Sequence, residues 1–153
     1  MNLSKHFTLE EFTKSQTGER LGIDNVPTEA HLVNMKRLCE DVLEVVRKNL
    51  GPIHVNSGYR GFALNVIVGG AATSQHCNGE AADIEIPGTP NGDLAKWIAA
   101  NCDYDQLILE CYKKGQPTSG WVHVSYKAEG NRKQELTATM INGKMSYTPG
   151  IHP

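Results

Sequence analysis

The decisive stretch of this chain is residues 74–83, which read Ser-Gln-His-Cys-Asn-Gly-Glu-Ala-Ala-Asp. His76 and Asp83 lie on either side of Gly79, and a glycine's freedom at positive φ lets the chain curl so that both side chains face one point. Further along, residues 121–125 read Trp-Val-His-Val-Ser, an alternating run that predicts a strand with His123 on one face. Two imidazoles and one carboxylate form a three-ligand zinc set that leaves a position open for water. The sequence therefore predicts one Zn²⁺ per chain, held by His76, Asp83 and His123, in an arrangement typical of hydrolases.

These residues also carry a resemblance to a known family. Five positions match the SxHxxGxAxD pattern of zinc D-alanyl-D-alanine peptidases, namely Ser74, His76, Gly79, Ala81 and Asp83. Residues 121–123 resemble the closing ligand motif of that family, and residues 57–60, Ser-Gly-Tyr-Arg, resemble its upstream substrate-binding segment. The resemblance runs from about residue 3 to residue 149 and is closest to the peptidase M15 group, which includes phage endolysins and bacterial cell-wall enzymes. It implies an α+β fold of the Hedgehog/DD-peptidase type, in which N-terminal helices pack on a small antiparallel sheet that carries the zinc site.

The resemblance further implies an activity and a substrate. We expect a zinc metallopeptidase that hydrolyses peptide bonds next to D-amino acids in the peptidoglycan stem peptide, as either a D,D-carboxypeptidase or an endopeptidase. The alternative is a non-catalytic, zinc-containing module that binds the cell wall on the same scaffold. A structural zinc site normally has four protein ligands, and the sequence suggests no fourth residue.

The general base is the least obvious part of this prediction. Many relatives carry a glutamate three residues before the last histidine ligand, where this chain has Gly120, and another branch carries a histidine where this chain has Trp121. Glu110 is the candidate base, because pairing of residues 106–112 with residues 121–126 would place it roughly opposite His123 on the same face. A glutamate in such an apolar run costs stability unless it has a partner. The alternative is an edge-strand glutamate that faces water.

Two further residues are candidates for substrate binding. Arg60 follows a glycine turn and suits a substrate carboxylate or a developing oxyanion; otherwise it is a surface arginine paired with an acid. Ser74 could donate a hydrogen bond to the substrate backbone or cap its own turn.

Composition limits the remaining classes of function. The 153 residues suit one domain, residues 1–153, and 39% hydrophobic with 21% charged residues describes a globular protein. A net charge of −2 provides no basic field for nucleic acid, and the basic pair Arg132-Lys133 is too short to change this. No segment approaches the ~20 apolar residues of a membrane span, and the N-terminus shows no signal peptide. We also expect a monomer. We therefore expect a soluble protein, and the family resemblance implies that it reaches the cell wall or periplasm by export or phage lysis. The four cysteines are expected to be reduced core thiols rather than disulfides.

Local patterns predict the elements. Thr8 and Glu11 form a capping box at the start of a short helix, and Thr28 caps a long amphipathic helix that ends near Leu50, before Gly51-Pro52. Further helices are expected over residues 62–68 and 93–101, and strands over residues 53–56, 81–86, 106–112, 121–126, 134–141 and 144–147, the last two as a hairpin around Asn142-Gly143. Helices first and an antiparallel sheet afterwards predict an α+β class, with the metal ligands grouped on the sheet.

Overall fold

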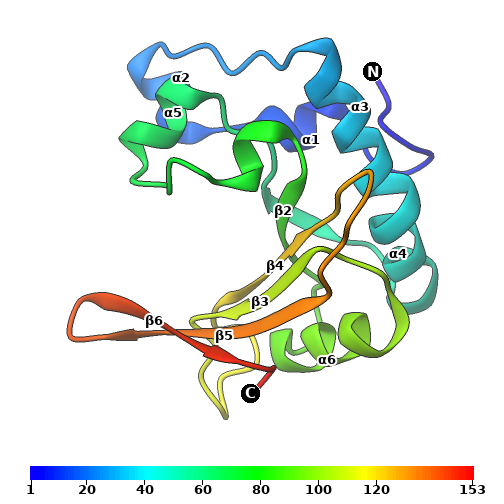
Figure 1. Cartoon of the computed structure of the whole chain (residues 1–153), viewed down its shortest axis with the longest axis vertical. Helices are drawn as coiled ribbons and strands as arrows, with labels where there is room; N and C mark the ends of the chain where they lie inside the picture. Colours follow the sequence, from blue (N-terminus) through cyan, green and yellow to red (C-terminus); the bar gives the residue numbers. More distant parts are fainter.

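A six-stranded sheet forms the centre of the molecule, as the computed structural model, which describes residues 1–153, shows (Figure 1). The strands lie in the order β1-β2-β4-β3-β5-β6. Their bounds are β1 His54–Ser57, β2 Ala81–Glu85, β3 Gln106–Glu110, β4 Trp121–Ser125, β5 Gln134–Ile141 and β6 Lys144–Pro149. The helical elements are α1 Leu9–Thr13, α2 Gln16–Leu21, α3 Glu29–Leu38, the π-helical η1 Cys39–Leu43, α4 Glu44–Leu50, α5 Phe62–Ile67, the 3₁₀ turn η2 Gln75–Asn78 and α6 Asn91–Asn101. The α+β class predicted from the sequence is therefore confirmed.

The sheet is antiparallel except at one pair of strands. β5 runs parallel to β3, with Ile108 opposite Leu136. Residues 126–133 carry the chain from β4 past the end of β3, so β5 runs opposite to β4 and therefore parallel to β3. The expectation of a wholly antiparallel sheet was wrong at this pair, because the crossing loop contains no signal that distinguishes it from a hairpin connection.

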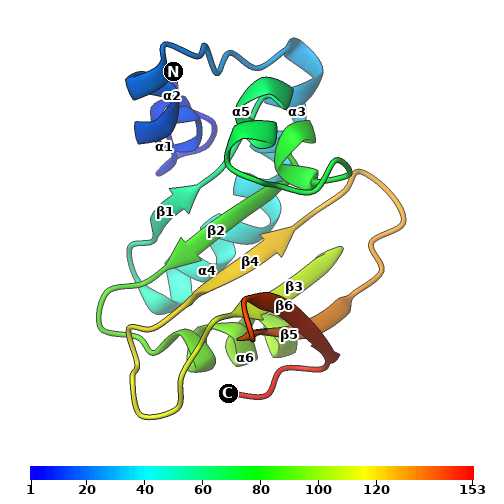
Figure 2. The same cartoon turned by 90° about the vertical axis from the view of Figure 1, so that its left-hand side faces the viewer.

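Helices cover only one face of the sheet. Figure 2 shows α4 and α6 behind the strands, and apolar residues of the strands share one buried core with residues of these helices. Leu107, Leu109, Val122 and Val124 are fully buried on this side. They belong to a core of 23 residues that also includes the buried stripe of α3, η1 and α4. The other face is left free for polar residues, as period-2 alternation requires.

The long N-terminal helix follows the prediction in its extent. The Thr28 hydroxyl accepts a hydrogen bond from the amide of His31, and the helix ends at Gly51, whose φ is 103°. Within it, residues 39–43 form a π-turn, which inserts an extra residue and keeps Cys39, Val42 and Leu43 all buried. The capping box of Thr8 and Glu11 is also present.

Helix α2 was not predicted. The Ser15 hydroxyl accepts from the amide of Gly18, and the helix ends at Gly22 in the left-handed conformation. A serine cap and a terminal glycine are ordinary helix signals, but six residues are too few for a periodic apolar stripe. None of the helices combines the length and apolar character needed to cross a bilayer.

The register of three central strands arranges the polar face. Asp83 lies opposite His123 between β2 and β4, and Ile108 lies opposite His123 between β4 and β3. Glu110 pairs with Trp121, so the expected pairing of Glu110 with His123 was wrong by two residues. A shift of two residues leaves every side chain on the same face of the sheet, and Glu110 therefore still shares a face with His123.

Candidate metal centre and catalytic cleft

The three predicted metal ligands come from two strands and one turn. Asp83 lies on β2 and His123 on β4, whereas His76 lies on the turn η2, so the expectation that the sheet carries all the ligands was wrong for His76. Gly79 ends this turn with a φ of 74°, and a Cβ there would lie 2.6 Å from the carbonyl oxygen of His31. Both the positive φ and the close packing on α3 therefore require glycine at this position.

The ligand atoms of these residues converge. Asp83 Oδ1 lies 3.4 Å from His76 Nε2 and 3.1 Å from His123 Nδ1, and all three ligand atoms lie within 4.8 Å of one another. Ligands bound tetrahedrally to zinc at about 2.0–2.2 Å are separated from one another by roughly 3.4 Å. The residues present therefore fit a zinc ion by both their chemistry and their spacing.

The orientation of His76 is set by a second contact. Its Nδ1 lies 2.6 Å from the carbonyl oxygen of Gly58, an acceptor that requires the proton to be on Nδ1. The lone pair of Nε2 is then directed toward Asp83 and is free to bind a metal. Such a contact fixes the tautomer and ring orientation of a ligating histidine.

Electrostatics keep the third ligand ionised. Burial raises the pKa of Asp83, but the neighbouring His76 and His123 outweigh it and hold that pKa well below its ordinary range. Both histidines are themselves buried, with exposures of 2% and 8%. A carboxylate that remains deprotonated is the form that a metal requires.

The ligands lie on the floor of a cavity of about 590 Å³. All six residues that the sequence indicated line it: Arg60, Ser74, His76, Asp83, Glu110 and His123. The three metal-ligand candidates come from η2, β2 and β4, and strand pairing and the η2 turn bring them together. The fold therefore places every predicted site residue in one cleft.

Glu110 lies in the cleft on an internal strand. Since β3 is paired on both sides, by β4 and β5, the alternative of an edge-strand glutamate was wrong. The indole Nε1–H of Trp121 donates to Glu110 Oε2 at 3.0 Å. Burial raises the pKa of Glu110, and the charge of Asp83 raises it further, against smaller opposing effects of His123, Trp121 and Arg60. A partly buried carboxyl group with a raised pKa beside a metal site has the properties of a general base.

The structure also explains why position 120 holds no glutamate. Gly120 has a φ of 66°, and a Cβ there would overlap the carbonyl oxygen of Glu110. The backbone of β3 therefore leaves no room for a side chain at position 120, and the cleft contains the carboxyl group of Glu110 from the neighbouring strand.

The structure distinguishes between the two roles considered for Arg60, and it shows one of the two roles considered for Ser74. Arg60 takes part in no ion pair, and its Nε is buried without a hydrogen-bond partner, so the reading as an arginine paired with a surface acid was wrong. The Ser74 hydroxyl accepts from the amide of His76 at 3.2 Å, which is the capping role. Ser74 also lines the cavity, and its hydroxyl proton is not used by this contact.

The cleft contains residues that the sequence did not indicate. Gln75, Arg132 and Tyr147 line it, and a buried carboxylate, Asp105, lies behind it. The basic pair Arg132-Lys133 is too short to indicate a nucleic-acid surface, yet its Arg132 forms part of the wall of the site. The four cysteines are free thiols, and Cys77 does not belong to the metal-ligand group.

Comparison with known families agrees with this site. Residues 5–125 match the sequence model of the family described as Peptidase M15, which is more than half of the chain. The chain belongs to the peptidase M15 family. A search of curated proteins found no match to it. The resemblance carried by residues 74–83 is thereby confirmed, and members of this family usually depend on zinc.

The matched range covers all three candidate ligands, Glu110 and Arg60, but ends at residue 125. Arg132 and Tyr147 lie beyond it, on the segment that contributes β5 and β6. This part of the cleft wall therefore belongs to the chain's own C-terminal segment.

Proposed function

We propose that this member of the M15 family is a zinc enzyme that hydrolyses peptide bonds next to D-amino acids in bacterial peptidoglycan. The observation that carries the proposal is the convergence of His76, Asp83 and His123 on the floor of a cavity that also contains Glu110. His76, Asp83 and His123 would hold the zinc ion, which when bound would supply Lewis-acid chemistry for activating a water and polarising the scissile carbonyl group. The M15 family and the composition of the ligand set support zinc as the metal.

Glu110 is the proposed general base. Because the indole of Trp121 occupies Oε2, Oε1 is the oxygen left to accept a proton from the attacking water. The same carboxyl group then donates that proton to the leaving amine. A raised pKa brings the carboxyl group closer to the operating pH, where such a transfer in both directions is most efficient.

Arg60 is the proposed partner of the substrate's terminal carboxylate. Its guanidinium group forms no ion pair within the protein, and its charge lowers the pKa of Glu110, which places it near the proposed reaction centre. A planar guanidinium can bind a carboxylate through two parallel hydrogen bonds. Ser74 is the proposed donor to the substrate backbone.

The non-catalytic alternative predicts a closed structural site. Structural zinc is almost always held by four protein ligands. The candidate group contains three, and it opens onto a cavity. These features favour the enzyme over the binding module.

The proposal is tested by incubating purified muropeptides with the zinc-loaded protein and analysing the products by mass spectrometry. We expect loss of a terminal D-amino acid, or cleavage of a cross-link, that stops when a chelator is added. Replacement His123→Ala should abolish the reaction, whereas His54→Ala, an exposed histidine on β1, should not. Unchanged muropeptides after prolonged incubation with zinc-loaded protein would refute the proposed substrate.

A further inference from the structure

A second arginine, Arg132, lines the same cleft as Arg60 and is separated from it across the width of the sheet. Arg60 follows β1 and Arg132 precedes β5, and the ligand-bearing strands β2 and β4 lie between them in the sheet. Arg132 is bound to Asp105, directly before β3, whereas Glu110 ends that strand. The centre of β3, Ile108, is aligned with His123 and Asp83. The metal ligands therefore lie between the proposed base and Arg132.

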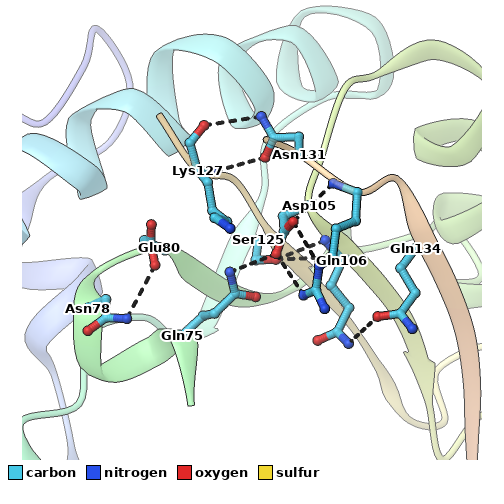
Figure 3. A network of polar contacts seen from close by, with 10 residues as sticks. Gln75, Asn78, Glu80, Asp105, Gln106, Ser125, Lys127, Asn131 and Gln134 are labelled. Atoms are coloured by element: carbon cyan, nitrogen blue, oxygen red, sulfur yellow. Dashed lines mark hydrogen bonds and ion pairs between the residues drawn. The ribbon is translucent and has the colours of Figure 1, made fainter. Parts of the chain in front are cut away.

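The position of Arg132 is fixed by a buried carboxylate. Its backbone amide and Nε each donate to Asp105 Oδ1 at 3.0 Å, and its Nη2 donates to Oδ2 at 2.8 Å. Asp105 is fully buried and also accepts from Gln75 Nε2 at 2.9 Å (Figure 3). The preceding loop is closed by paired hydrogen bonds between Lys127 and Asn131. Arg132 is thus oriented before any substrate arrives, which lowers the entropic cost of a contact.

This arrangement leaves donors of Arg132 unused. A guanidinium group has five N–H donors, and Asp105 takes one from Nε and one from Nη2. The edge formed by Nη1 and the second hydrogen of Nη2 has no acceptor in the protein, while the side chain is 54% exposed and lines the cavity. Two parallel donors on that edge match the two oxygens of a carboxylate.

We propose that Arg132 recognises a second carboxylate of the substrate, on the opposite side of the scissile bond from the carboxylate bound by Arg60. The inference rests on the proposed peptidase function and narrows its substrate to stem peptides with a free side-chain carboxyl group before the scissile bond. A carboxamide at the same place offers one acceptor and directs its own N–H groups at the guanidinium. Because Asp105 offsets part of the charge of Arg132, selectivity depends on the geometry of the donors.

The test compares two stem peptides that differ only in whether this side-chain carboxyl group is free or amidated. Binding is measured by calorimetry on zinc-loaded Glu110→Gln protein, so that the substrate persists, and hydrolysis is measured on the wild type. We expect the free carboxylate to bind about 10-fold more tightly, the effect of one or two hydrogen bonds to a charged group.

Removing Arg132 alone would leave Asp105 buried without its cation, so the main variant combines Asp105→Asn with Arg132→Gln. It should lose the 10-fold preference, and Arg132→Lys, which keeps the charge but not the paired donors, should lose most of it. Arg37→Gln, on α3 and outside the cleft, is the matched control and should keep the preference.

The two hypotheses fail differently. Equal binding of both peptides, or a preference that survives in both Arg132 variants, would overturn the inference even if the peptides are hydrolysed. A binding preference that depends on Arg132, without hydrolysis of either peptide by the wild type, would support the inference about recognition and refute the proposed activity.

Discussion

At the scale of single residues, Glu110 is the most informative position. Replacement Glu110→Gln removes the proton acceptor but keeps an oxygen that can accept from Trp121, so metal content and fold should be retained. Turnover of muropeptides should fall by about 10²–10⁴-fold, the usual contribution of a general acid–base group. Zinc content and circular dichroism check the first expectation, and initial rates check the second. Glu129→Gln, in an exposed loop, is the control, and near-normal turnover of Glu110→Gln would place the base elsewhere.

The acidic limb of the pH–rate profile should also belong to Glu110. Burial raises its pKa, and only the deprotonated form can act as a base. Activity should therefore rise with pH through a midpoint above that of an ordinary glutamate. A profile of kcat/KM between pH 4 and pH 8 measures the midpoint, with the free metal concentration held constant. An acidic limb at the ordinary glutamate value would contradict the burial argument.

The ionisation of Asp105 should make the free energy of unfolding depend on pH. Burial raises its pKa, but hydrogen bonds from Arg132 and Gln75 outweigh this and bring the pKa to about 2, below its ordinary 3.8. The folded state thus favours the carboxylate, and this stability is present above pH 3.8 and is lost as the pH falls through 2. Between these limits the free energy of unfolding should lose on the order of 2 kcal/mol through this group. Urea titrations should show a flatter acid dependence for Asp105→Asn, whereas Asp103→Asn, at an exposed neighbour, should behave as the wild type.

At the scale of elements, the turn before β4 depends on one glycine. A Cβ at Gly120 would overlap the Glu110 carbonyl oxygen at a φ of 66°, whereas Gly115, in the same connection, has a φ of 84° and open space around it. Gly115→Ala should therefore cost only the left-handed strain, about 1 kcal/mol, and Gly120→Ala about 3 kcal/mol or more. Thermal unfolding of both variants measures the difference. Equal losses would mean that β3 and β4 adjust to the added methyl group.

Elements with local signals could be predicted from the sequence. Thr8 and Thr28 predict the starts of two helices because both are N-cap residues. Asn142-Gly143 provides the two positive-φ residues of a tight hairpin turn. The parallel pairing of β5 with β3 could not be predicted, because it follows from where residues 126–133 cross. The register of Glu110 was missed by two residues for a related reason: the connection to β4 contains its own turn, closed by a bridge between Lys113 and Gln116, which alternation does not reveal.

The candidate site likewise contains residues that could be predicted from the sequence and residues that could not. His76, Asp83 and His123 could be predicted because their residue types are restricted by metal chemistry and their spacing is characteristic. Arg132 could not be predicted, since its position in the cleft depends on its hydrogen bonds with Asp105, which lies 27 residues earlier. In the sequence, nothing distinguishes Asp105 from the other acidic residues. Only the crossing loop and the parallel pair bring these two residues to the cleft.

At the scale of the whole molecule, one core connects the helices and the sheet. Its 23 buried residues include members of α1, of the α3–α4 helix, of α6 and of the strands, and no second core is separate from it. We therefore propose that residues 1–153 form one domain that unfolds in a single transition. Calorimetry checks this expectation, and two resolved transitions would contradict it.

Metal binding should shift this one transition as a unit, because the ligands join η2 to β2 and β4 and the unfolded chain cannot hold them together. Zinc at 100 times its dissociation constant should stabilise the fold by about 2.7 kcal/mol, which for a domain of this size raises Tm by roughly 5–10 °C. Melting curves with and without a chelator measure the shift, and elemental analysis should find one zinc per chain. His123→Ala should abolish the shift and His54→Ala should keep it. A shift that survives in His123→Ala would place the metal outside the cleft. It would also contradict the role of Glu110 as the general base beside that metal.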